Sequence, residues 1–175
     1  LTLDPKDPNI VYVAFWQVRR LPWGFNSGGV NSGLYKSTDG GKTFNKIHNG
    51  FPPGKLGRLA IAVAPSNPNI LYTVIEGEKD ERKGLYRSDD AGANWKQLNN
   101  DFGIVVRPFY FSRLEVDPRN PDVVVKAGLL GSISRDGGTT FKNLGPNHSD
   151  VHDIVFDIGN SDRMYIATDG GIYRS

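Results

Sequence analysis

One short turn sequence occurs three times in this chain, and it constrains the fold more than any other feature. Residues 37–44, 88–95 and 134–141 all fit the pattern Ser-x-Asp-x-Gly-x-(Thr/Asn)-aromatic. A pattern that recurs after tens of residues is typical of a chain built from similar units packed side by side. We therefore expect an array of like units.

A second segment precedes each of these turns. Residues 3–12, 63–72 and 116–125 share a Pro-x-(Asp/Asn)-Pro-(Asn/Asp) core followed by apolar residues, and 156–165 is a degenerate fourth copy. Proline fixes φ, and asparagine tolerates turn conformations, so the core predicts a tight turn between two strands. Copies of the two segments alternate with a period of about 50 residues, which suits the four-stranded blade of a β-propeller.

The four strands of each unit are here called A to D. In the second unit we expect them at 59–63, 70–75, 84–88 and 94–98, with Ile61 and Val63 on one face of strand A and Ala60 and Ala62 on the other. No stretch has sustained helical periodicity. The predicted fold is all-β, a propeller segment of about three and a half four-stranded antiparallel blades. The blades are expected within about 1–49, 50–99, 100–145 and 146–175.

The recurring turn lies between strands C and D, where several backbone N–H groups lack partners. An Asp side chain can accept those hydrogen bonds, glycine can supply φ > 0, and the aromatic residue can begin strand D and pack between sheets. Three equivalent copies favour a structural role over a catalytic one. The residues concerned are Asp39, Gly41 and Phe44, then Asp90, Gly92 and Trp95, then Asp136, Gly138 and Phe141.

These turns resemble the Asp-box, or bacterial neuraminidase repeat, of sialidases, xyloglucan-degrading glycosidases, sortilin-type receptors and a photosystem II assembly factor. Together with the Pro-x-Asn-Pro segment, the chain is most similar to prokaryotic sortilin-like and xyloglucanase-like propeller proteins. The resemblance implies a β-propeller located outside the cell, on its surface or in the periplasm. It does not fix the function, because unrelated activities share the turn.

The ends of the chain suggest an incomplete ring. Residues 171–175 parallel 33–37 and 84–88, so Ser175 corresponds to the first residue of a further turn motif. An open arc would expose apolar blade faces. We therefore expect the remaining blades to come from the same chain or from other chains.

Composition excludes several classes of partner. The net charge is only +2, and the Lys and Arg residues are scattered, so nucleic acid is not expected as a partner. No apolar run approaches the length of a membrane span, so we expect no membrane-spanning segment in these residues. The absence of cysteine excludes disulfides and thiolate metal sites.

The propeller arrangement places the B–C and D–A loops on one face, and these are the long, varied loops. We expect function there, in residues 17–32, 49–58, 77–83, 99–112 and 145–151. Aromatic and arginine side chains in these loops suit a glycan or a protein partner, although packing between blades and simple solvation explain them as well. The candidate ligand-binding residues are Arg19, Arg20, Trp23, Phe25, Arg107 and Tyr110.

One segment has metal-ligand character. In an extended backbone, His148, Asp150 and His152 would lie on one side and could hold a divalent ion. Ile154 and Phe156 share that side, so the alternative is that His152 is a buried, hydrogen-bonded histidine. No other cofactor is expected.

The enzymes among the similar families set a stricter test. A sialidase needs three arginines and a tyrosine–glutamate pair, and no such pair is identifiable, although arginines are available on the expected face. A xyloglucanase-like enzyme needs two carboxylates across its cleft. The favoured interpretation is therefore a binding scaffold whose catalytic residues, if any, are unknown, and the alternative is an arc of a glycoside hydrolase. The arginine candidates are Arg19, Arg58, Arg107 and Arg113, and the carboxylate candidates are Asp101, Asp150 and Asp153.

Overall fold

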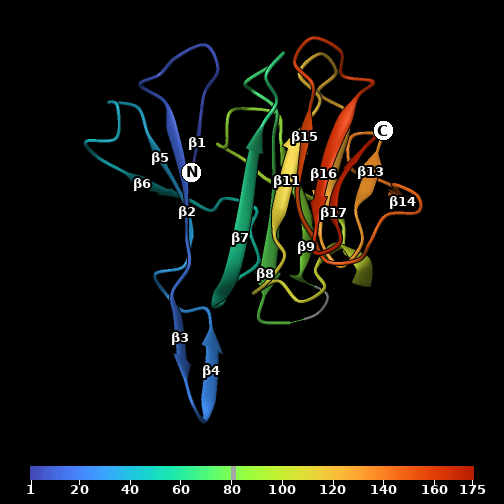
Figure 1. Cartoon of the computed structure of the whole chain (residues 1–175). Helices are drawn as coiled ribbons and strands as arrows, with labels where there is room; N and C mark the ends of the chain where they lie inside the picture. Colours follow the sequence, from blue (N-terminus) through green and yellow to red (C-terminus); the bar gives the residue numbers. More distant parts are fainter. Residues whose placement is uncertain (80–81) are drawn as a thin grey trace.

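The computed structural model of the chain describes residues 1–79 and 82–175. Within these residues, four antiparallel sheets of three or four strands follow one another along the chain, and a fifth, two-stranded sheet is inserted between two strands of the first. Figure 1 shows the innermost strands of the second, third and fourth sheets side by side at the centre. The predicted fold class is confirmed, since the chain is an all-β arc of propeller blades.

The first two blades have four strands each. The hydrogen-bonded order is A–B–C–D in both, with the A strand at the inner edge. Blade 1 contains β1 (Thr2–Leu3), β2 (Val11–Phe15), β5 (Gly33–Ser37) and β6 (Asn45–Ile47); blade 2 contains β7 (Leu56–Val63), β8 (Leu71–Gly77), β9 (Gly84–Ser88) and β10 (Lys96–Asn99).

The third blade repeats this order, and the fourth has strands A to C. The A strands of successive blades contact one another along the inner edge of the arc. Blade 3 contains β11 (Arg113–Val116), β12 (Val124–Ala127), β13 (Ser132–Ser134) and β14 (Lys142–Asn143); blade 4 contains β15 (Val151–Phe156), β16 (Met164–Thr168) and β17 (Gly171–Arg174).

The apolar core lies between blades. Three clusters of buried side chains fill the interfaces of blades 1 and 2, 2 and 3, and 3 and 4. In β7, Ala60 and Ala62 face blade 3 while Leu59 and Val63 face blade 1, so both faces of this strand are covered, as its alternation predicts. Tyrosines of strand B also cross these interfaces. The hydroxyl of Tyr12 donates to the carbonyl of Ala91 at 3.1 Å, and that of Tyr72 to the carbonyl of Pro121 at 2.9 Å.

The three Ser-x-Asp turns have the same hydrogen bonds. In each, the serine hydroxyl donates to the Asp Oδ1 at 2.7–2.8 Å and accepts the glycine N–H at 2.8–2.9 Å. The Asp Oδ2 accepts a side-chain bond from Thr43, Asn94 or Thr140 at 2.6–2.7 Å. These side-chain bonds, followed by backbone ones, lower the pKa of each Asp to about 2. The glycines adopt φ of 86–92°, which favours glycine at this position.

The prediction that the closing aromatic residue begins strand D is wrong, because in each blade this residue lies one position before the strand. Strand D of blade 2 accordingly begins at Lys96, two residues later than predicted. The reason is that the backbone N–H of Asn94 donates to Asp90 at 2.8 Å and is unavailable to a sheet partner. Trp95 is buried against blade 1, whereas Phe44 is partly exposed.

The predicted irregular loop 17–32 contains a regular hairpin. Strands β3 (Val18–Leu21) and β4 (Gly24–Ser27) pair from Val18↔Ser27 to Leu21↔Gly24, and the turn consists of Pro22 and Trp23. Pro22 pre-sets the φ that the turn requires. Figure 1 shows this hairpin extending away from the blades. Of the other predicted loops, 77–83 includes positions 80 and 81, which lie outside the described residues.

Candidate functional site

A row of ring side chains crosses the B–C and D–A face. Its members come from the β2–β3 connection, the hairpin, the 99–112 loop and strand β15, so the row spans several blades. Centroids of successive rings lie 4.6–6.5 Å apart. We call this set the aromatic row; in order, it comprises Trp16, Phe25, Phe109, Tyr110, Phe111 and His152.

Arg58, near the start of β7, contacts two members of the row and holds them in place. Its Nη1 donates to the carbonyl of Phe109 at 2.7 Å, and its guanidinium lies 5.2 Å from the centroid of Trp16. Burial, and then the charge of Arg113, lowers the pKa of Arg58. Glu76 Oε2 accepts the backbone N–H of Arg58 at 2.8 Å and the Ser27 hydroxyl at 2.7 Å. The hairpin base, β7 and the 99–112 loop are thus joined by one set of polar contacts.

The 99–112 loop presents its aromatic residues through a left-handed turn. Arg107 adopts φ 48°, and its carbonyl accepts the N–H groups of Tyr110 and Phe111 at 2.9 and 3.1 Å. The backbone of Arg107 therefore positions the row, while its side chain is exposed.

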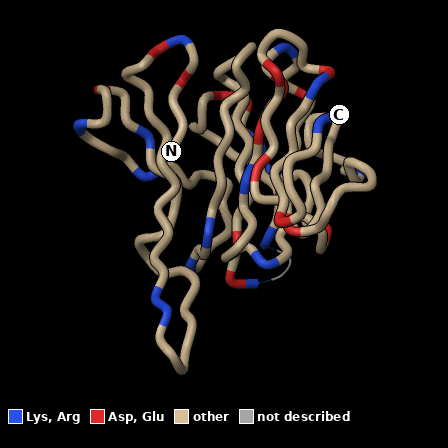
Figure 2. Tube along the Cα trace, viewed as in Figure 1, with Lys and Arg blue, Asp and Glu red and all other residues tan. Residues whose placement is uncertain are grey.

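The candidate ligand-binding residues divide into two groups. Phe25 and Tyr110 lie in the row and are 46% and 53% exposed, so the row is open to a ligand. Arg19, Arg20 and Trp23 lie along the hairpin, and Trp23 is 82% exposed at its tip. Figure 2 shows basic positions on this hairpin and no acidic ones.

A polar pocket of about 360 Å³ lies beside the row, against the inner strands β7, β11 and β15. Alternation in β11 exposes Arg113 and Glu115 and buries the residues between and after them. A register shift in β15 falls between Val151 and Asp153. We call this the channel-side pocket; its polar and aromatic lining comprises Trp16, Arg58, Ser112, Arg113, Glu115 and Asp153.

The two carboxylates of this pocket differ in environment. Arg113 Nη1 lies 3.5 Å from Asp153 Oδ2. Glu115 is surrounded by protein while its side chain still reaches solvent through the pocket, and this partial burial, followed by the negative charge of Asp153, raises the pKa of Glu115 to about 7. The pocket thus holds a carboxyl group with a raised pKa beside an aspartate that pairs with arginine.

The sequence-based search identified Asp153 and missed Glu115. A signal was present. Aligned on the strand-A segments, Glu115 occupies the position of Thr2, Ala62 and Val155 in the other repeats. A carboxyl group at a position otherwise filled by uncharged residues departs from the structural repeat.

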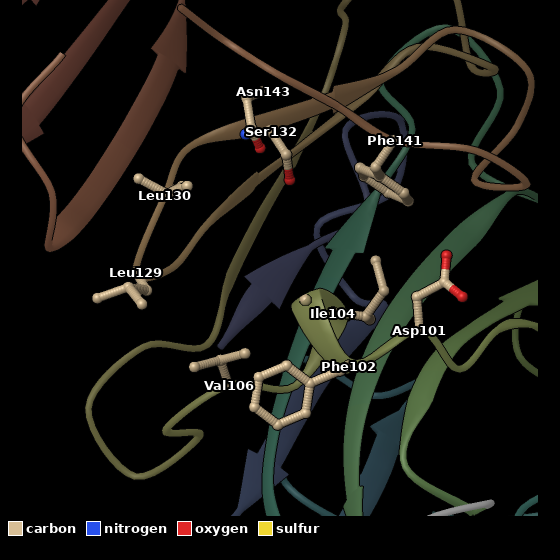
Figure 3. Close-up of a pocket in the computed structure, with 10 residues that line it drawn as sticks. Asp101, Phe102, Ile104, Val106, Leu129, Leu130, Ser132, Phe141 and Asn143 are labelled. Carbon is tan, nitrogen blue, oxygen red and sulfur yellow. The ribbon is translucent and has the colours of Figure 1, made fainter. Parts of the chain in front are cut away.

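A second pocket, of about 320 Å³, lies between the 101–106 segment and blade 3 (Figure 3). Its lining is mostly apolar, with Phe102, Ile104, Leu129 and Phe141 converging on it, and Asp101 stands at its edge. Two of the predicted carboxylate candidates, Asp101 and Asp153, therefore lie in different pockets.

The third carboxylate candidate, Asp150, belongs to the predicted metal set, which the structure does not bring together. Asp150 adopts φ 59°, so the backbone is not extended there, and β15 begins only at Val151. His152 is exposed, contrary to the buried alternative, and its Nε2 lies 2.6 Å from Asp169 Oδ1. His148 Nδ1 contacts the Ser149 carbonyl at 2.9 Å. Within residues 1–79 and 82–175, no three His, Asp or Glu side chains form a metal-binding group.

The arginines are also dispersed. Arg58 and Arg113 share the channel-side pocket, whereas Arg19 lies on the hairpin and Arg107 in the 99–112 loop. The four do not form one triad for a sialic acid carboxylate. None of the described residues forms a helix long and apolar enough to cross a membrane.

Comparison with known proteins finds sequence similarity to two xyloglucanases and to a dispase autolysis-inducing protein. No family model matches the chain. Xyloglucanase Xgh74A of Acetivibrio thermocellus is 38% identical over 168 residues, covering 81% of this chain and 19% of that protein. A xyloglucanase of a Paenibacillus species is 37% identical over 78 residues (45% and 7%), and the dispase autolysis-inducing protein of Streptomyces mobaraensis is 37% identical over 73 residues (41% and 19%). The chain spans at most about a fifth of these relatives.

Solved structures show the same fold over nearly the whole chain. The GH74 enzyme of Niastella koreensis has a TM-score of 0.66 at 22% identity, covering 98% of this chain and 27% of that one. The GH74 xyloglucanase of Xanthomonas campestris has a TM-score of 0.66 at 18% identity, covering 99% and 28%. The chain therefore has a propeller-type fold related to that of xyloglucanases.

Proposed function

We propose that this chain is an arc of a polysaccharide-degrading glycoside hydrolase, and that its aromatic row binds a glucan chain of the xyloglucan type. The similarity to xyloglucanases over 81% of the chain supports the choice of polymer. This assignment develops the glycoside hydrolase alternative, and the glycan-binding scaffold becomes the part that this arc contributes.

The observation that carries the proposal is the exposure and spacing of the row. Sugar rings have apolar C–H faces that pack on aromatic faces, while their hydroxyl groups need polar partners at the edges. Phe25 and Tyr110 supply exposed faces, and the guanidinium of Arg58 lies next to Trp16 and Phe109 of the same row. A surface that extends over several blades suits an extended polymer better than a small molecule.

Three further assignments belong to this proposal. The Ser-x-Asp turns are Asp-box turns, which is supported by hydrogen bonds that recur in all three copies. Further blades, from the same chain or from others, complete the ring. The protein acts outside the cell, because its polymeric substrate is too large to enter.

A protein partner is the second candidate. The hairpin extends from the blades (Figure 1). It carries Trp23 in its turn and Arg19 and Arg20 in β3, which suits a contact with an acidic protein surface. Glycan binding that is unaffected by Trp23→Ala would leave the hairpin free for such a role.

Affinity electrophoresis of the full-length protein in gels containing xyloglucan tests the main proposal. Tyr110→Ala and Phe25→Ala should each weaken binding about tenfold, the equivalent of about 1.4 kcal/mol. The matched control is Phe44→Ala, a partly exposed aromatic residue in a C–D turn on the opposite face, which should bind as the wild type does. Absence of wild-type binding, or equal binding by all variants, contradicts the proposal.

A further inference from the structure

The face of blade 4 that points away from blade 3 carries large, exposed apolar residues. Ile154 and Ile166 pack against blade 3, so the residues that alternate with them point to the other face. There, Val155, Tyr165 and Ile172 are 47%, 37% and 79% exposed. Strand pairing places further side chains beside them. We call this surface the open face; it comprises Val155, Tyr165, Ala167, Ile172 and Arg174.

The equivalent faces of blades 1 and 2 are buried. Ile172 occupies the position of Leu34 in blade 1 and of Leu85 in blade 2, as the repeats 171–175, 33–37 and 84–88 show. Both leucines are 0% exposed, because each lies in an apolar cluster that the next blade covers. An apolar face of this kind is stable only when a neighbouring blade packs on it.

A tyrosine and a cation strengthen the junction of blades 1 and 2. Tyr12 and Lys36 lie opposite each other on β2 and β5, and both donate to the carbonyl of Ala91 in blade 2, at 3.1 and 2.8 Å. Lys36 Nζ also lies 5.3 Å from the centroid of the Tyr12 ring. The two side chains thus bind one oxygen of the next blade, and one of the two bonds is charge-assisted.

The junction of blades 2 and 3 has the same device with an arginine. Tyr72 and Arg87 lie opposite each other on β8 and β9, and the Tyr72 hydroxyl donates to the Pro121 carbonyl of blade 3 at 2.9 Å. Arg87 Nη1 donates to the Tyr72 hydroxyl at 2.9 Å and to Asp122 Oδ1 at 2.6 Å. The arginine therefore reaches a carboxylate in the A–B turn of the next blade. We call each tyrosine–cation set a junction pair.

Blade 4 carries a junction pair that has no partner within residues 1–79 and 82–175. Tyr165 and Arg174 lie opposite each other on β16 and β17, as the pairs of blades 1 and 2 do. Neither side chain forms a hydrogen bond or an ion pair with another described residue. Blade 3 has Val125 and Ile133 at these two positions and still forms its sheet. The pair is therefore not required by the sheet that carries it, and its known contacts are with the following blade.

Resting on the part of the proposed function in which further blades complete the ring, we propose that the open face docks another blade of the same polypeptide, and that Tyr165 and Arg174 bind oxygens on the turn face of that blade. Its A–B turn should carry a carboxylate for Arg174, as the turn of blade 3 carries Asp122 for Arg87.

The source in the same polypeptide is supported by the other junctions and by the relatives. In each of the three described junctions, the neighbour is the next blade along the chain. The curated relatives are also far longer than this chain, which spans at most about a fifth of them. A second copy of the chain is the competing source.

Thiol labelling of the full-length protein tests whether the open face is covered. Residues 1–175 contain no cysteine, so one substitution introduces one reactive site in this arc, which peptide mass spectrometry identifies. Ile172→Cys should react with a maleimide about 10²-fold more slowly than the control Ile158→Cys, which replaces a residue that is 90% exposed in the A–B turn of blade 4. Equal rates overturn the proposal.

Dilution and light scattering identify the source of the docked blade. A monomeric mass, with protection at position 172 that is independent of concentration, supports a blade of the same polypeptide. A dimeric mass, or protection that is lost on dilution, assigns the docked blade to a second copy and overturns the proposed source.

A further comparison tests the junction pair. In the Ile172→Cys background, Arg174→Met should raise the labelling rate about tenfold, because loss of a charge-assisted bond lets the junction open more often. The matched control is Arg135→Met, an exposed arginine in the C–D turn of blade 3, which should leave the rate unchanged. Equal rates in the two variants overturn the role of Arg174. These results are independent of xyloglucan binding in gels, whose absence contradicts the proposed function and not the docking of a blade.

Discussion

The two faces of the arc differ in what they repeat. On the face of the A–B and C–D turns, three Ser-x-Asp turns hold the same hydrogen bonds, with serine–aspartate distances of 2.7, 2.8 and 2.7 Å. On the opposite face, residues 17–32 contain a hairpin, and residues 99–112 contain a 3₁₀ turn (Phe102–Ile104) and a left-handed turn at Arg107. The repeated face satisfies a backbone requirement that every blade shares, and the other face is free to vary.

This comparison separates stability from binding. Changes on the turn face should lower the free energy of unfolding and leave ligand affinity intact. Changes on the loop face should lower ligand affinity and leave the free energy of unfolding intact, except where a residue joins the loops to the blades. Three substitutions test this separation, and a fourth tests how the stability depends on pH.

The largest effect is expected for Gly138→Ala in the third turn. A Cβ at this position would lie 2.5 Å from Leu85 Cδ2, and φ is +92°. Overpacking and backbone strain together should lower the free energy of unfolding by roughly 2–4 kcal/mol in denaturant titrations. Gly145→Ala is the control, because its φ is +99° and no atom lies within 4 Å of the added Cβ. Equal losses in both variants would mean that packing against blade 2 contributes nothing.

Ser88→Ala should have a smaller effect on the same face. Ser88 Oγ accepts the N–H of Gly92 at 2.9 Å, and its loss leaves that buried group unpaired. We expect a decrease of about 1–3 kcal/mol in the free energy of unfolding, with xyloglucan binding unchanged. Weaker binding in this variant would contradict the separation of the two faces.

Arg58→Met tests the exception, since Arg58 joins the loop face to β7. The substitution keeps the stem but removes the bond to the Phe109 carbonyl and the contact with Trp16. The free energy of unfolding should decrease by about 1–2 kcal/mol. Xyloglucan binding should weaken because Trp16 and Phe109 are no longer held in place. Arg113→Met, which removes a guanidinium from the same pocket without these contacts, serves as the control. If both variants lose the same amount of binding, the effect comes from the loss of a positive charge and not from the contacts of Arg58.

The smallest effect concerns pH. Glu115 has a pKa of about 7 in the folded chain against an ordinary value of 4.5, so the folded state holds more protons between these values. Stability should therefore decrease slightly as pH rises from about 4.5 to 7, and Glu115→Gln should flatten this decrease in thermal melts. The turn aspartates, with pKa values of about 2, contribute stability that is lost only at more acidic pH. A slope that persists in Glu115→Gln would assign the proton uptake to another group.

The repeated parts of the molecule were predictable from sequence because each repeat reports the same backbone geometry. The blade order, the A–B turns and the faces of β7 all follow from the repeated segments. Features without a second copy were harder. The hairpin was hidden in a Gly- and Asn-rich segment, where the Pro22–Trp23 turn is the only marker.

The candidate site depends on contacts between blades, which sequence spacing does not encode. Glu115 and Asp153 line the same pocket because β11 and β15 are adjacent inner strands, although the two residues lie in different repeats. The metal prediction relied on uniform extension through 148–152, and the left-handed backbone at Asp150 removes that basis. Arg58 was identified as an arginine on the correct face, but its contact with the Phe109 carbonyl required the fold.

The placement of the apolar clusters between the blades determines which duplications and deletions of sequence the fold can accept. Because each cluster is shared by two successive sheets, no sheet has an interior of its own, and Tyr12 and Tyr72 each reach into the following neighbour. Duplication or deletion of one complete repeat leaves every remaining blade packed against a neighbour of the same kind. A deletion that ends inside a repeat instead removes apolar contacts on both sides of the affected blade. We therefore expect propellers of this kind to differ from one another by whole repeats.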